Sequence, residues 1–560
     1  MVSNPSSAGH AIVRALEAHG VDRVFQVPGE SFLDVLDGLH DAGIHTVVCR
    51  QEGGATYAAE ADGKLTGRPG VAMVTRGPGA ANAMVAIHQA WQDATPLVLF
   101  VGLVPVGHRQ REAFQEFDIR GWFGTTTKRV LVLDEPGRAS EMVAEAFGTA
   151  RSGRPGPVVV GLPEDVLRRP FDGTHAAPLP VSDGAVDPAE LRTLGELLAA
   201  ARRPLVVTGG NEWSPAGAAA ITAWLERADI PAITQWRADG VVASDSPVFA
   251  GTLGYRRDNT AAAALDQADL VLAVGCVLGE IDTDGYRLRQ RPDARTVIVS
   301  IDPARTGHSG PVTRHILARP DVFAAALADL VPAADPDRNG WRQQLRAAQE
   351  RSAALGPPTE QPPGTPASMT GVLRELVPQL PRDAIVTYGA GNHTGWAQRF
   401  VPTRTYPALL STRNGSMGYS IPSALAASLR HPDRVVVTVA GDGEFMMNGN
   451  ELATARQHGA NPLVILMDNA QFGTIRAHQE ASYPGRVSGT QLSNPDFAAI
   501  ATAMGAFGAR IEHADQIAKG VESALRAVRE ERRPALLHVV VDPAVLLPDP
   551  PPPGSTEQPG

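Results

Sequence analysis

The sequence predicts an α/β protein made of three doubly wound domains with parallel sheets. Short apolar runs rich in Val, Ile and Leu alternate with segments of helical period along almost all of the 560 residues. This alternation is typical of parallel sheets covered by helices on both faces. Polar, Pro-containing stretches divide it into three blocks of similar size. A chain of this length is expected to form about three or four domains, so each block predicts one domain.

The first domain is expected over residues 1–175. Its apolar runs end in Gly, Pro or a charged turn, as the strands of a doubly wound sheet do. The runs are Val21–Val27, His45–Arg50, Gly70–Thr75, Pro96–Gly102 and Pro157–Leu162. A linker containing Pro and Ala is expected at Thr174–Pro188.

The remaining chain repeats the pattern twice. Residues 188–335 predict a central, Rossmann-like domain, whose strands are Pro204–Thr208, Ile230–Thr234, Asp269–Gly275 and Thr296–Ile301. Residues 336–369 are polar and Pro-rich and predict a partly helical linker. Residues 370–545 predict the third domain, and the Pro-rich tail 546–560 predicts disorder.

The composition restricts the class of protein. The net charge is −10 with acids and bases interspersed, and no basic stripe indicates nucleic-acid binding. The two cysteines, Cys49 and Cys276, exclude a disulfide framework and predict a reducing compartment. The N-terminus lacks the pattern of a signal peptide, and no run of 18 apolar residues predicts a membrane span. We therefore expect a cytoplasmic protein that binds neither nucleic acid nor a membrane.

The third block carries the strongest chemical signal. Gly441-Asp442-Gly443 is followed after 25 residues by Asn469. The apolar runs Val435–Ala440 and Pro462–Met467 predict strands on either side of a helix over Glu444–His458.

A right-handed crossover makes two such strands parallel neighbours, so Asp442 and Asn469 are expected at the same carboxyl edge of the sheet. A carboxylate and an amide oxygen suit Mg²⁺. Backbone N–H groups at the glycines and the helix start suit phosphate. The segment therefore predicts a metal-bridged diphosphate site, the alternative being a plain strand–helix–strand unit with an Asp-containing turn.

Glu52 occupies a second junction of this kind. An apolar strand ends at Arg50-Gln51, and Glu52 begins a Gly/Ala-rich helix. A carboxyl group held at a strand end can hydrogen-bond a ring nitrogen of a ligand. The alternative is a glutamate favoured at a helix start by the helix dipole.

The spacing from Gly441-Asp442-Gly443 to Asn469 resembles the signature of thiamine diphosphate (ThDP) enzymes. Five further segments resemble loops of the acetolactate synthase family within that group, so the resemblance covers essentially the whole chain in domain order. They are V-F-Q-V-P-G-E-S (24–31), V-T-R-G-P-G-A-A-N-A (74–83), A-F-Q-E (113–116), G-A-G-N-H-T-G-W-A-Q (389–398) and G-S-M-G-Y-S-I-P-S-A (415–424).

The resemblance implies pyrimidine-binding, central and diphosphate-binding domains and a role for each matching residue. Glu52 would promote the imino form of the pyrimidine that generates the reactive ylide, and Gln115 would lie on the active-site loop. Met417 would be the apolar wedge under the cofactor, and the metal ligands would be Asp442, Asn469 and the backbone carbonyl of Gln471. The other implied cofactor contacts are Pro28, Pro78, Asn82, Asn392, His393, Gly441, Gly443, Glu444 and Gly473.

The resemblance also implies a homodimer or homotetramer, with each active site between the first domain of one subunit and the third domain of another. The implied reaction is decarboxylation of a 2-oxo acid through an enamine, which then attacks a second carbonyl. Simple decarboxylation remains an alternative, as do acyl-CoA-type decarboxylation, aldehyde lyase activity and cyclic-diketone hydrolysis. A non-catalytic relative and a flavin- or NAD-dependent oxidoreductase are the alternatives from other classes.

Three departures from acetolactate synthases bear on the substrate. Val277 and Ile281 stand where that family has arginines that help to hold FAD, so FAD binding is not expected. His478 stands where the family has an acceptor-selecting Trp, and a neutral histidine there is a candidate proton shuttle or a plain surface residue. Glu30 replaces a small residue; an acid at this place handles protons in related decarboxylases, and the alternative is a solvated loop glutamate.

Overall fold

Three six-stranded parallel sheets form the framework of the protein. The structure is a computed structural model, and it describes residues 7–180, 184–255, 257, 259–304, 309–330, 336–356, 362 and 364–548. The strand orders are β2-β1-β3-β4-β6-β5, β12-β11-β10-β7-β8-β9 and β14-β13-β15-β16-β18-β17. The prediction of an α/β protein with three doubly wound parallel sheets is therefore confirmed.

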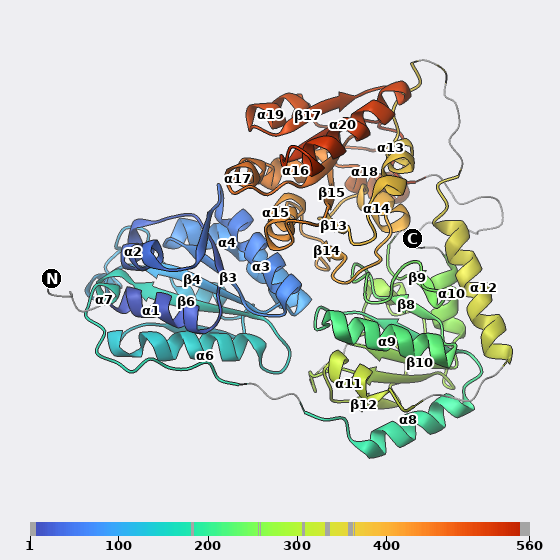
Figure 1. Cartoon of the computed structure of the whole chain (residues 1–560), viewed down its shortest axis with the longest axis horizontal. Helices are drawn as coiled ribbons and strands as arrows, with labels where there is room; N and C mark the ends of the chain where they lie inside the picture. The colour runs from blue at the N-terminus through green and yellow to red at the C-terminus, as the bar shows by residue number, and fades with distance from the viewer. Residues whose placement is uncertain are drawn as a thin grey trace. The chain divides into compact units, whose positions relative to one another are not determined.

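The first sheet is covered on both faces by helices (Figure 1, blue to teal). Helices α1, α2 and α6 share a hydrophobic core with one face, and α3 and α4 contact the strands as well. The strands are β1 Arg23–Gln26, β2 His45–Val48, β3 Gly70–Val74, β4 Leu97–Leu103, β5 Arg129–Val132 and β6 Pro157–Pro163. The helices are α1 Ala8–Ala18, α2 Leu33–Asp41, α3 Glu52–Thr66, α4 Gly77–Asp93, α5 Ile119–Phe123, α6 Ala139–Arg151 and α7 Glu164–Leu167.

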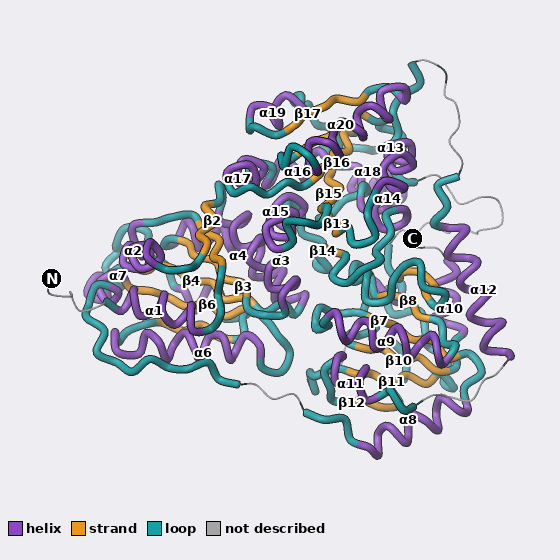
Figure 2. Tube along the Cα trace, viewed as in Figure 1, coloured by secondary structure: helices purple, strands orange, loops and turns teal. Residues whose placement is uncertain are grey.

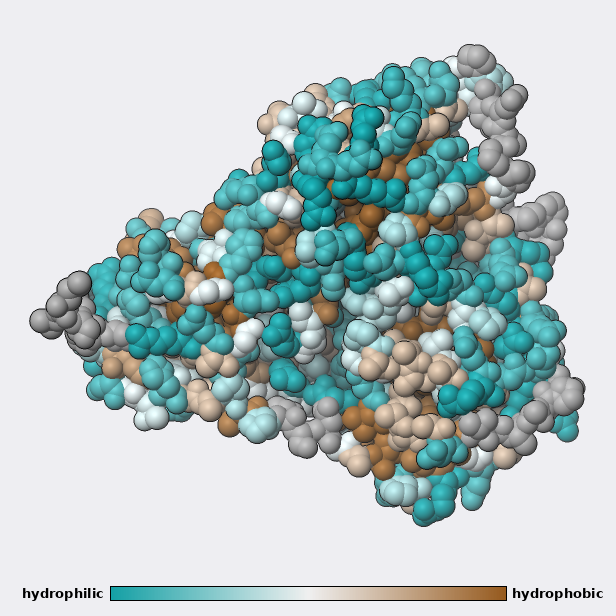
Figure 3. Space-filling model, viewed as in Figure 1, coloured by the Kyte–Doolittle hydropathy of each residue, from teal (hydrophilic) through white to brown (hydrophobic). Residues whose placement is uncertain are grey.

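The second sheet has separate hydrophobic cores on its two faces. Its strands are β7 Pro204–Thr208, β8 Ala232–Thr234, β9 Phe249–Thr252, β10 Leu270–Val274, β11 Arg295–Val299 and β12 Arg314–Ile316. Its helices are α8 Pro188–Ala200, α9 Pro215–Ala228, α10 Asn259–Gln267, α11 Pro320–Ala326 and α12 Pro336–Ser352. Hydrophilic residues cover most of the face seen in Figure 3, and apolar residues gather there over α11 and β12.

The third sheet carries the Gly-Asp-Gly segment at the end of a central strand. Its strands are β13 Ile385–Tyr388, β14 Leu409–Ser411, β15 Val436–Gly441, β16 Leu463–Asp468, β17 Phe507–Ile511 and β18 Ala535–Val540. The helices of this part of the chain are α13 Met369–Leu376, α14 Thr394–Phe400, α15 Ser420–Arg430, α16 Asp442–Asn448, α17 Glu451–Gln457, α18 Gly473–Ser482, α19 Phe497–Ala503 and α20 Ile517–Arg529 (Figure 2).

Contacts between elements divide the chain into two compact units. The first unit combines Met1–Ser182 with two later segments, Arg413–His431 and Met446–Ala460, so α15 and α17 belong with the first sheet. The second unit contains Asp183–Thr412, Pro432–Phe445 and Asn461–Gly560, with the second and third sheets. The domain boundaries inferred from the sequence stay predictions.

Two details differ from the sequence-based expectations. In the first two sheets the strands β5, β9 and β12 were not expected, and each lies at an edge of its sheet; in the third sheet only β15 and β16 were expected by residue range. The single helix expected over Glu444–His458 is divided into α16 and α17. Gly449-Asn450 forms the turn between them, and glycine is a weak helix former.

Some expectations fall outside the described part of the chain. The predicted linker 336–369 contains α12, but its residues 357–361 and 363 are not among those described. The same holds for residues 181–183 of the first linker and for 549–560 of the predicted disordered tail. Among the helices that are described, none has the length and apolar character needed to span a membrane.

Candidate active site

The carboxyl edge of the third sheet brings the two predicted metal ligands together. Strands β15 and β16 are parallel neighbours, with Gly441 paired to Met467, so the residues that follow each strand leave the sheet side by side. Asp442 is the first residue of α16 and Asn469 directly follows β16, and both side chains are buried. The prediction that the two strands are parallel neighbours is confirmed.

Both carboxylate oxygens of Asp442 are oriented by the protein. Oδ1 accepts a hydrogen bond from the N–H of Gly443 at 2.9 Å, and Oδ2 accepts one from Nδ2 of Asn494 at 2.7 Å. The same Asn494 nitrogen donates to Oδ1 of Asp468 at 2.7 Å. Burial raises the pKa of Asp442 to about 6. Asn494 thus holds two neighbouring carboxyl groups in place.

Asp468 has its own anchor on the other side. Nε2 of the fully buried His538 lies 2.8 Å from its Oδ2. Burial opposes the charged form of Asp468, but the hydrogen bonds from His538, Asn494 and the N–H of Ala470 outweigh it and hold its pKa below the usual value. Asp468 carries a sequence signal, because it directly precedes Asn469, whereas no local pattern indicates Asn494 or His538.

Two glycines at this edge, Gly441 and Gly473, are in close contact with neighbouring side chains. A Cβ atom on Gly441 would lie 2.7 Å from Nδ1 of His393, and one on Gly473 would lie 2.9 Å from Nδ2 of Asn469. Real Cβ atoms do not come so close to other heavy atoms, so side chains at either position would push these groups apart. The predicted glycines therefore allow His393 and Asn469 to pack directly against the backbone at this edge.

His393 presents a buried polar atom at this edge. Its Nε2 is buried and makes no hydrogen bond with the described residues. Burial, together with the positive charge of Arg237, lowers the pKa of His393 to about 3, so the ring is neutral near pH 7. Next to it, Asn392 accepts a hydrogen bond from Oγ1 of Thr474 at 2.8 Å. A group that bonds to His393 Nε2 would satisfy an otherwise unpaired atom.

Of the other residues predicted for this part of the site, Gln471 and Glu444 are buried and His478 is exposed. Gln471 is buried, and its backbone carbonyl accepts the N–H of Gly473 at 2.9 Å, which leaves one lone pair for a metal ion. Glu444 is buried beside Gly389, where a Cβ atom would overlap its Oε1. His478 lies on the exposed side of α18.

The donor set is of mixed type. In the described part of the chain, no cluster of three or more His, Cys, Asp or Glu side chains is suited to a metal ion. The predicted ligands are one carboxylate, one amide oxygen and one backbone carbonyl, which are hard oxygen ligands of the kind that Mg²⁺ prefers. The residues present therefore fit a magnesium-bound diphosphate.

In the first unit, the predicted residues gather where α3 and α4 begin. Glu52 is the first residue of α3, and the side chain of Gln51 caps the helix by accepting the N–H of Gly54 at 2.9 Å. Nδ2 of Asn82, on α4, donates to Oε2 of Glu52 at 2.8 Å. The structure thus brings Glu52 and Asn82 together, and Pro78 is exposed on the first turn of α4.

Gln115 contacts the start of α4 through its backbone carbonyl. The residue has a left-handed conformation with φ of 63°, and its carbonyl accepts the N–H of Gly77 at 3.2 Å. Glu30 has a side chain that is 67% exposed and pairs with Arg76 at 3.1 Å. Arg76 also pairs with Glu164, and Pro28 is exposed in the loop before Glu30.

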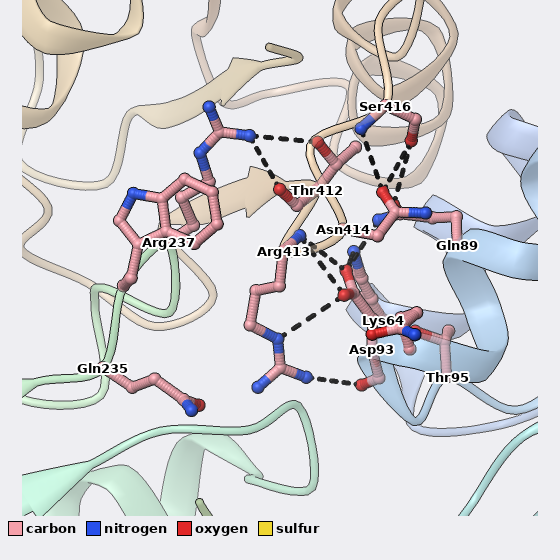
Figure 4. Close-up of polar contacts among 12 residues, drawn as sticks. Lys64, Gln89, Asp93, Thr95, Gln235, Arg237, Thr412, Arg413, Asn414 and Ser416 are labelled. Carbon is pink, nitrogen blue, oxygen red and sulfur yellow. Dashed lines mark hydrogen bonds and ion pairs between the residues drawn. The ribbon is translucent and has the colours of Figure 1, made fainter. Parts of the chain in front are cut away.

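The segment with Met417 is fixed to the first sheet's helices by buried charges. The guanidinium and the backbone N–H of Arg413 bond to Asp93, which also pairs with Lys64 at 2.7 Å (Figure 4). The hydroxyl of Tyr57 donates to the carbonyl of Met417 at 3.5 Å. Met417 itself is half-buried.

In the central domain, the segment that carries Val277 and Ile281 is anchored to the end of β8. Asp282, next to Ile281, is buried and accepts hydrogen bonds from Nε2 of Gln235 at 3.1 Å and from the N–H of Trp236 at 2.9 Å. In the same unit, Arg237 donates to the carbonyl of Thr412 at 2.7 Å (Figure 4). The segment with Val277 and Ile281 is therefore tied to the end of β8 by neutral and acidic groups.

Comparisons with known proteins agree with this arrangement. The chain matches the N-terminal TPP binding domain of thiamine pyrophosphate enzymes over residues 6–122, their central domain over residues 191–327 and their C-terminal TPP binding domain over residues 389–539. Thiamine pyrophosphate, abbreviated TPP, is another name for ThDP.

Full-length relatives point to one family. The acetolactate synthase isozyme 2 large subunit of Escherichia coli is 32% identical over 95% of this chain and 95% of its own. The acetolactate synthase large subunit of Parasynechococcus marenigrum is 32% identical over 93% of this chain and 86% of its own. The probable acetolactate synthase large subunit of Methanocaldococcus jannaschii is 29% identical over 97% and 93%. This chain therefore belongs to the thiamine pyrophosphate enzymes and, within them, to the acetolactate synthase large-subunit family.

Proposed function

We propose that the protein is a ThDP- and Mg²⁺-dependent enzyme that decarboxylates a 2-oxo acid and joins the remaining acyl unit to a second carbonyl compound. The observation that supports this most directly is the pair Asp442 and Asn469 at adjacent strand ends, next to a glycine-lined edge. The names of its relatives, acetolactate synthase large subunits, point to the same reaction.

The residues of the third sheet would hold the cofactor. Asp442, Asn469 and the carbonyl of Gln471 would bind Mg²⁺, and His393 with the backbone of Gly441 and Gly443 would lie against the diphosphate, the N–H of Gly443 being used by Asp442. ThDP, when bound, supplies the electron sink that accepts the electrons left by loss of CO₂.

Glu52 would exchange a proton with the ring nitrogen of the pyrimidine. Asn82 fixes its Oε2, which leaves Oε1 for that proton. General acid–base groups of this kind contribute about 10²–10⁴-fold to a rate. Gln115, Glu30 and His478 stay candidates for contacts with the substrate, and Pro28, Pro78 and Met417 for contacts with the cofactor.

We further propose that the enzyme is a homodimer or homotetramer whose active sites combine residues of two copies. Glu52 and Asp442 lie in separate compact units, and the relatives are named as subunits. A complementation experiment tests this directly. If the Glu52→Gln and Asp442→Ala chains are mixed and reassembled as dimers, about a quarter of the parental activity should return, because half of the dimers are mixed and one of their two sites is intact. No recovery would place both residues in one chain's site.

A flavin is not part of the proposal, because Val277 and Ile281 lack the cationic groups for it. The purified protein should be colourless and active without FAD. Stoichiometric flavin in the absorbance spectrum of fresh protein would contradict this. The cytoplasmic location stays a prediction from the sequence.

The reaction is tested with a panel of 2-oxo acids, with CO₂ release and product mass measured together. We expect CO₂ and a 2-hydroxy-3-oxo acid formed from donor and acceptor. CO₂ with an aldehyde alone would indicate simple decarboxylation, and neither product from any acid would contradict the proposed function.

A further inference from the structure

Glu451, the first residue of α17, places a fully buried carboxylate against the turn between β2 and α3. Its Oε1 accepts the backbone N–H of Arg50 at 2.9 Å and that of Gln51 at 3.0 Å. Its Oε2 accepts the hydroxyl of Thr454 at 2.5 Å. One carboxylate thus binds two successive backbone N–H groups in the manner of an anion in a nest of amides.

These two N–H groups belong to the residues directly before Glu52. Strand β2 ends at Val48, and α3 begins at Glu52, so the turn between them lies outside both ladders of backbone hydrogen bonds. A buried N–H group without a partner costs about 1–3 kcal/mol. The backbone that leads into Glu52 is therefore fixed by a side chain about 400 residues away in sequence.

A glycine in α3 makes room for this carboxylate. A Cβ atom on Gly54 would lie 2.6 Å from Oε1 of Glu451. Gly54 lies in the first turn of α3, and the closely packed carboxylate gives a physical reason for glycine at this position. Burial raises the pKa of Glu451, and the hydrogen bonds from Thr454, Arg50 and Gln51 oppose that shift.

The same helix holds the turn at two further points. Nε2 of His458, just after α17, accepts the N–H of Val48 at 3.1 Å. Oε1 of Gln457 accepts a hydrogen bond from the guanidinium of Arg50 at 2.6 Å. The end of β2 and the start of α3 are therefore bound to α17 residue by residue, and Glu451 makes the contacts closest to Glu52.

We propose that Glu451 is a positioning residue that sets the place and orientation of Glu52. The inference rests on the proposed function, in which Glu52 exchanges a proton with the cofactor. Displacing a reacting group by about 1 Å can lower a rate about 10²-fold. Loss of the carboxylate should therefore slow proton exchange while leaving cofactor affinity, which depends on the third sheet, almost unchanged.

The test compares the parent with Glu451→Ala, Glu451→Gln and Gly54→Ala. Amide hydrogen exchange of peptide 48–53, measured without cofactor, reports the contacts themselves. In the protein with ThDP and Mg²⁺, exchange of the cofactor's C2 proton with deuterium reports the action of Glu52. We expect Glu451→Ala to exchange the peptide faster and the C2 proton about 10–10²-fold more slowly. Glu451→Gln keeps an acceptor oxygen and should retain most of the parental rate.

Gly54→Ala puts a methyl group where the carboxylate lies and should act in the same direction as Glu451→Ala. It answers the question if Glu451→Ala does not fold. Glu60→Gln is the matched control, because Glu60 is a fully buried carboxylate on α3 that bonds to Tyr419 and Thr95. This control should exchange the C2 proton at the parental rate.

Each outcome separates the two ideas. A parental C2 exchange rate in both Glu451→Ala and Gly54→Ala, with a slow rate in Glu52→Gln, would overturn the positioning role and leave the proposed function standing. Equal slowing in Glu60→Gln would also overturn it, because any lost buried carboxylate would then suffice. Equal rates in the parent and Glu52→Gln would overturn the role of Glu52 and, with it, that of Glu451.

Discussion

The β2–α3 and β15–α16 junctions both lead from a parallel strand into a helix, through a three-residue turn in the first and directly in the second. In each, a parallel strand leads into a helix whose first residue is acidic, Glu52 in one and Asp442 in the other. Asp442 is 3% exposed and has both oxygens bonded by the protein, whereas Glu52 is partly exposed and receives one bond, from Asn82. A helix start favours negative charge in both cases. This difference in burial and bonding fits the proposed roles, in which Asp442 is a fixed metal ligand and Glu52 exchanges a proton.

Asp442→Ala should have the largest effect, because it removes the only carboxylate among the three proposed ligands. We expect Mg²⁺-dependent ThDP retention to be lost while the fold, followed by circular dichroism, is kept. Asp515→Ala, at an exposed position in the same part of the chain, is the control and should bind ThDP normally. Undiminished ThDP binding by Asp442→Ala would remove the distinction between the two junctions.

Glu52→Gln should lower activity by about 10²–10⁴-fold, since glutamine keeps the size of the side chain but cannot carry the proton. ThDP should still bind, which a titration of the cofactor's circular dichroism signal would show. The exposed Glu141→Gln, on α6, serves as control. If Glu52→Gln instead bound ThDP more weakly but kept the parental rate at saturating ThDP, Glu52 and Asp442 would have the same kind of role.

Asn494→Ala sharpens the comparison, because it removes a hydrogen bond that orients Asp442 at the β15–α16 junction. The variant removes the donor that holds Asp442 and Asp468 together. Groups that orient metal ligands typically contribute about 10–100-fold to metal affinity. We therefore expect the dissociation constant of Mg²⁺ to increase by a factor in that range. Calorimetry in the presence of ThDP measures it. An unchanged constant would mean that Gly443 alone suffices to orient Asp442.

The smallest expected effect is on the pH dependence of stability, and it tests whether water is excluded from His393 beside the β15–α16 junction. The pKa of His393 in the folded protein, about 3, lies below the ordinary value of 6.5. The unfolded chain therefore takes up the proton first, and stability is lost as the pH falls from 6.5 towards 3. Between pH 6.5 and 5 this amounts to about 1.5 kcal/mol, a loss that His393→Gln should not show. Denaturant unfolding of both proteins measures the difference, and parallel curves would indicate a solvated ring.

In the first two sheets the sequence predicted every interior strand and the edge strand β2, but missed the edge strands β5, β9 and β12. Interior strands such as β7 and β10 are buried on both faces and form unbroken apolar runs. The edge strand β12, Arg314–Ile316, has one buried residue of three, and β5 begins with an exposed arginine. Edge strands are short and partly polar, which is how proteins protect an open edge, but this also removes the hydrophobic signal.

The site shows the same limit. Asp442 and Asn469 were predictable because a short crossover fixes where two neighbouring strands end. Asn494 and Glu451 were not, because their contacts join parts of the chain that no local pattern connects. Glu451 was assigned only to the helix expected over Glu444–His458, and its contact with Arg50 depends on how the first unit folds.

The first unit is built from chain segments that are far apart in the sequence, and this affects the order in which it can fold during synthesis. Helix α3 is buried along most of its length, partly against α15, and its Asp62 pairs with Arg430 at the end of that helix. The ribosome makes α15 only after Asp183–Thr412, which takes about 10–50 s at about 5–20 residues per second. Throughout that interval the new sheet has all six strands while α3 lacks its cover. The first unit is therefore complete only once Ala460 has emerged, although its own sheet ends at Pro163.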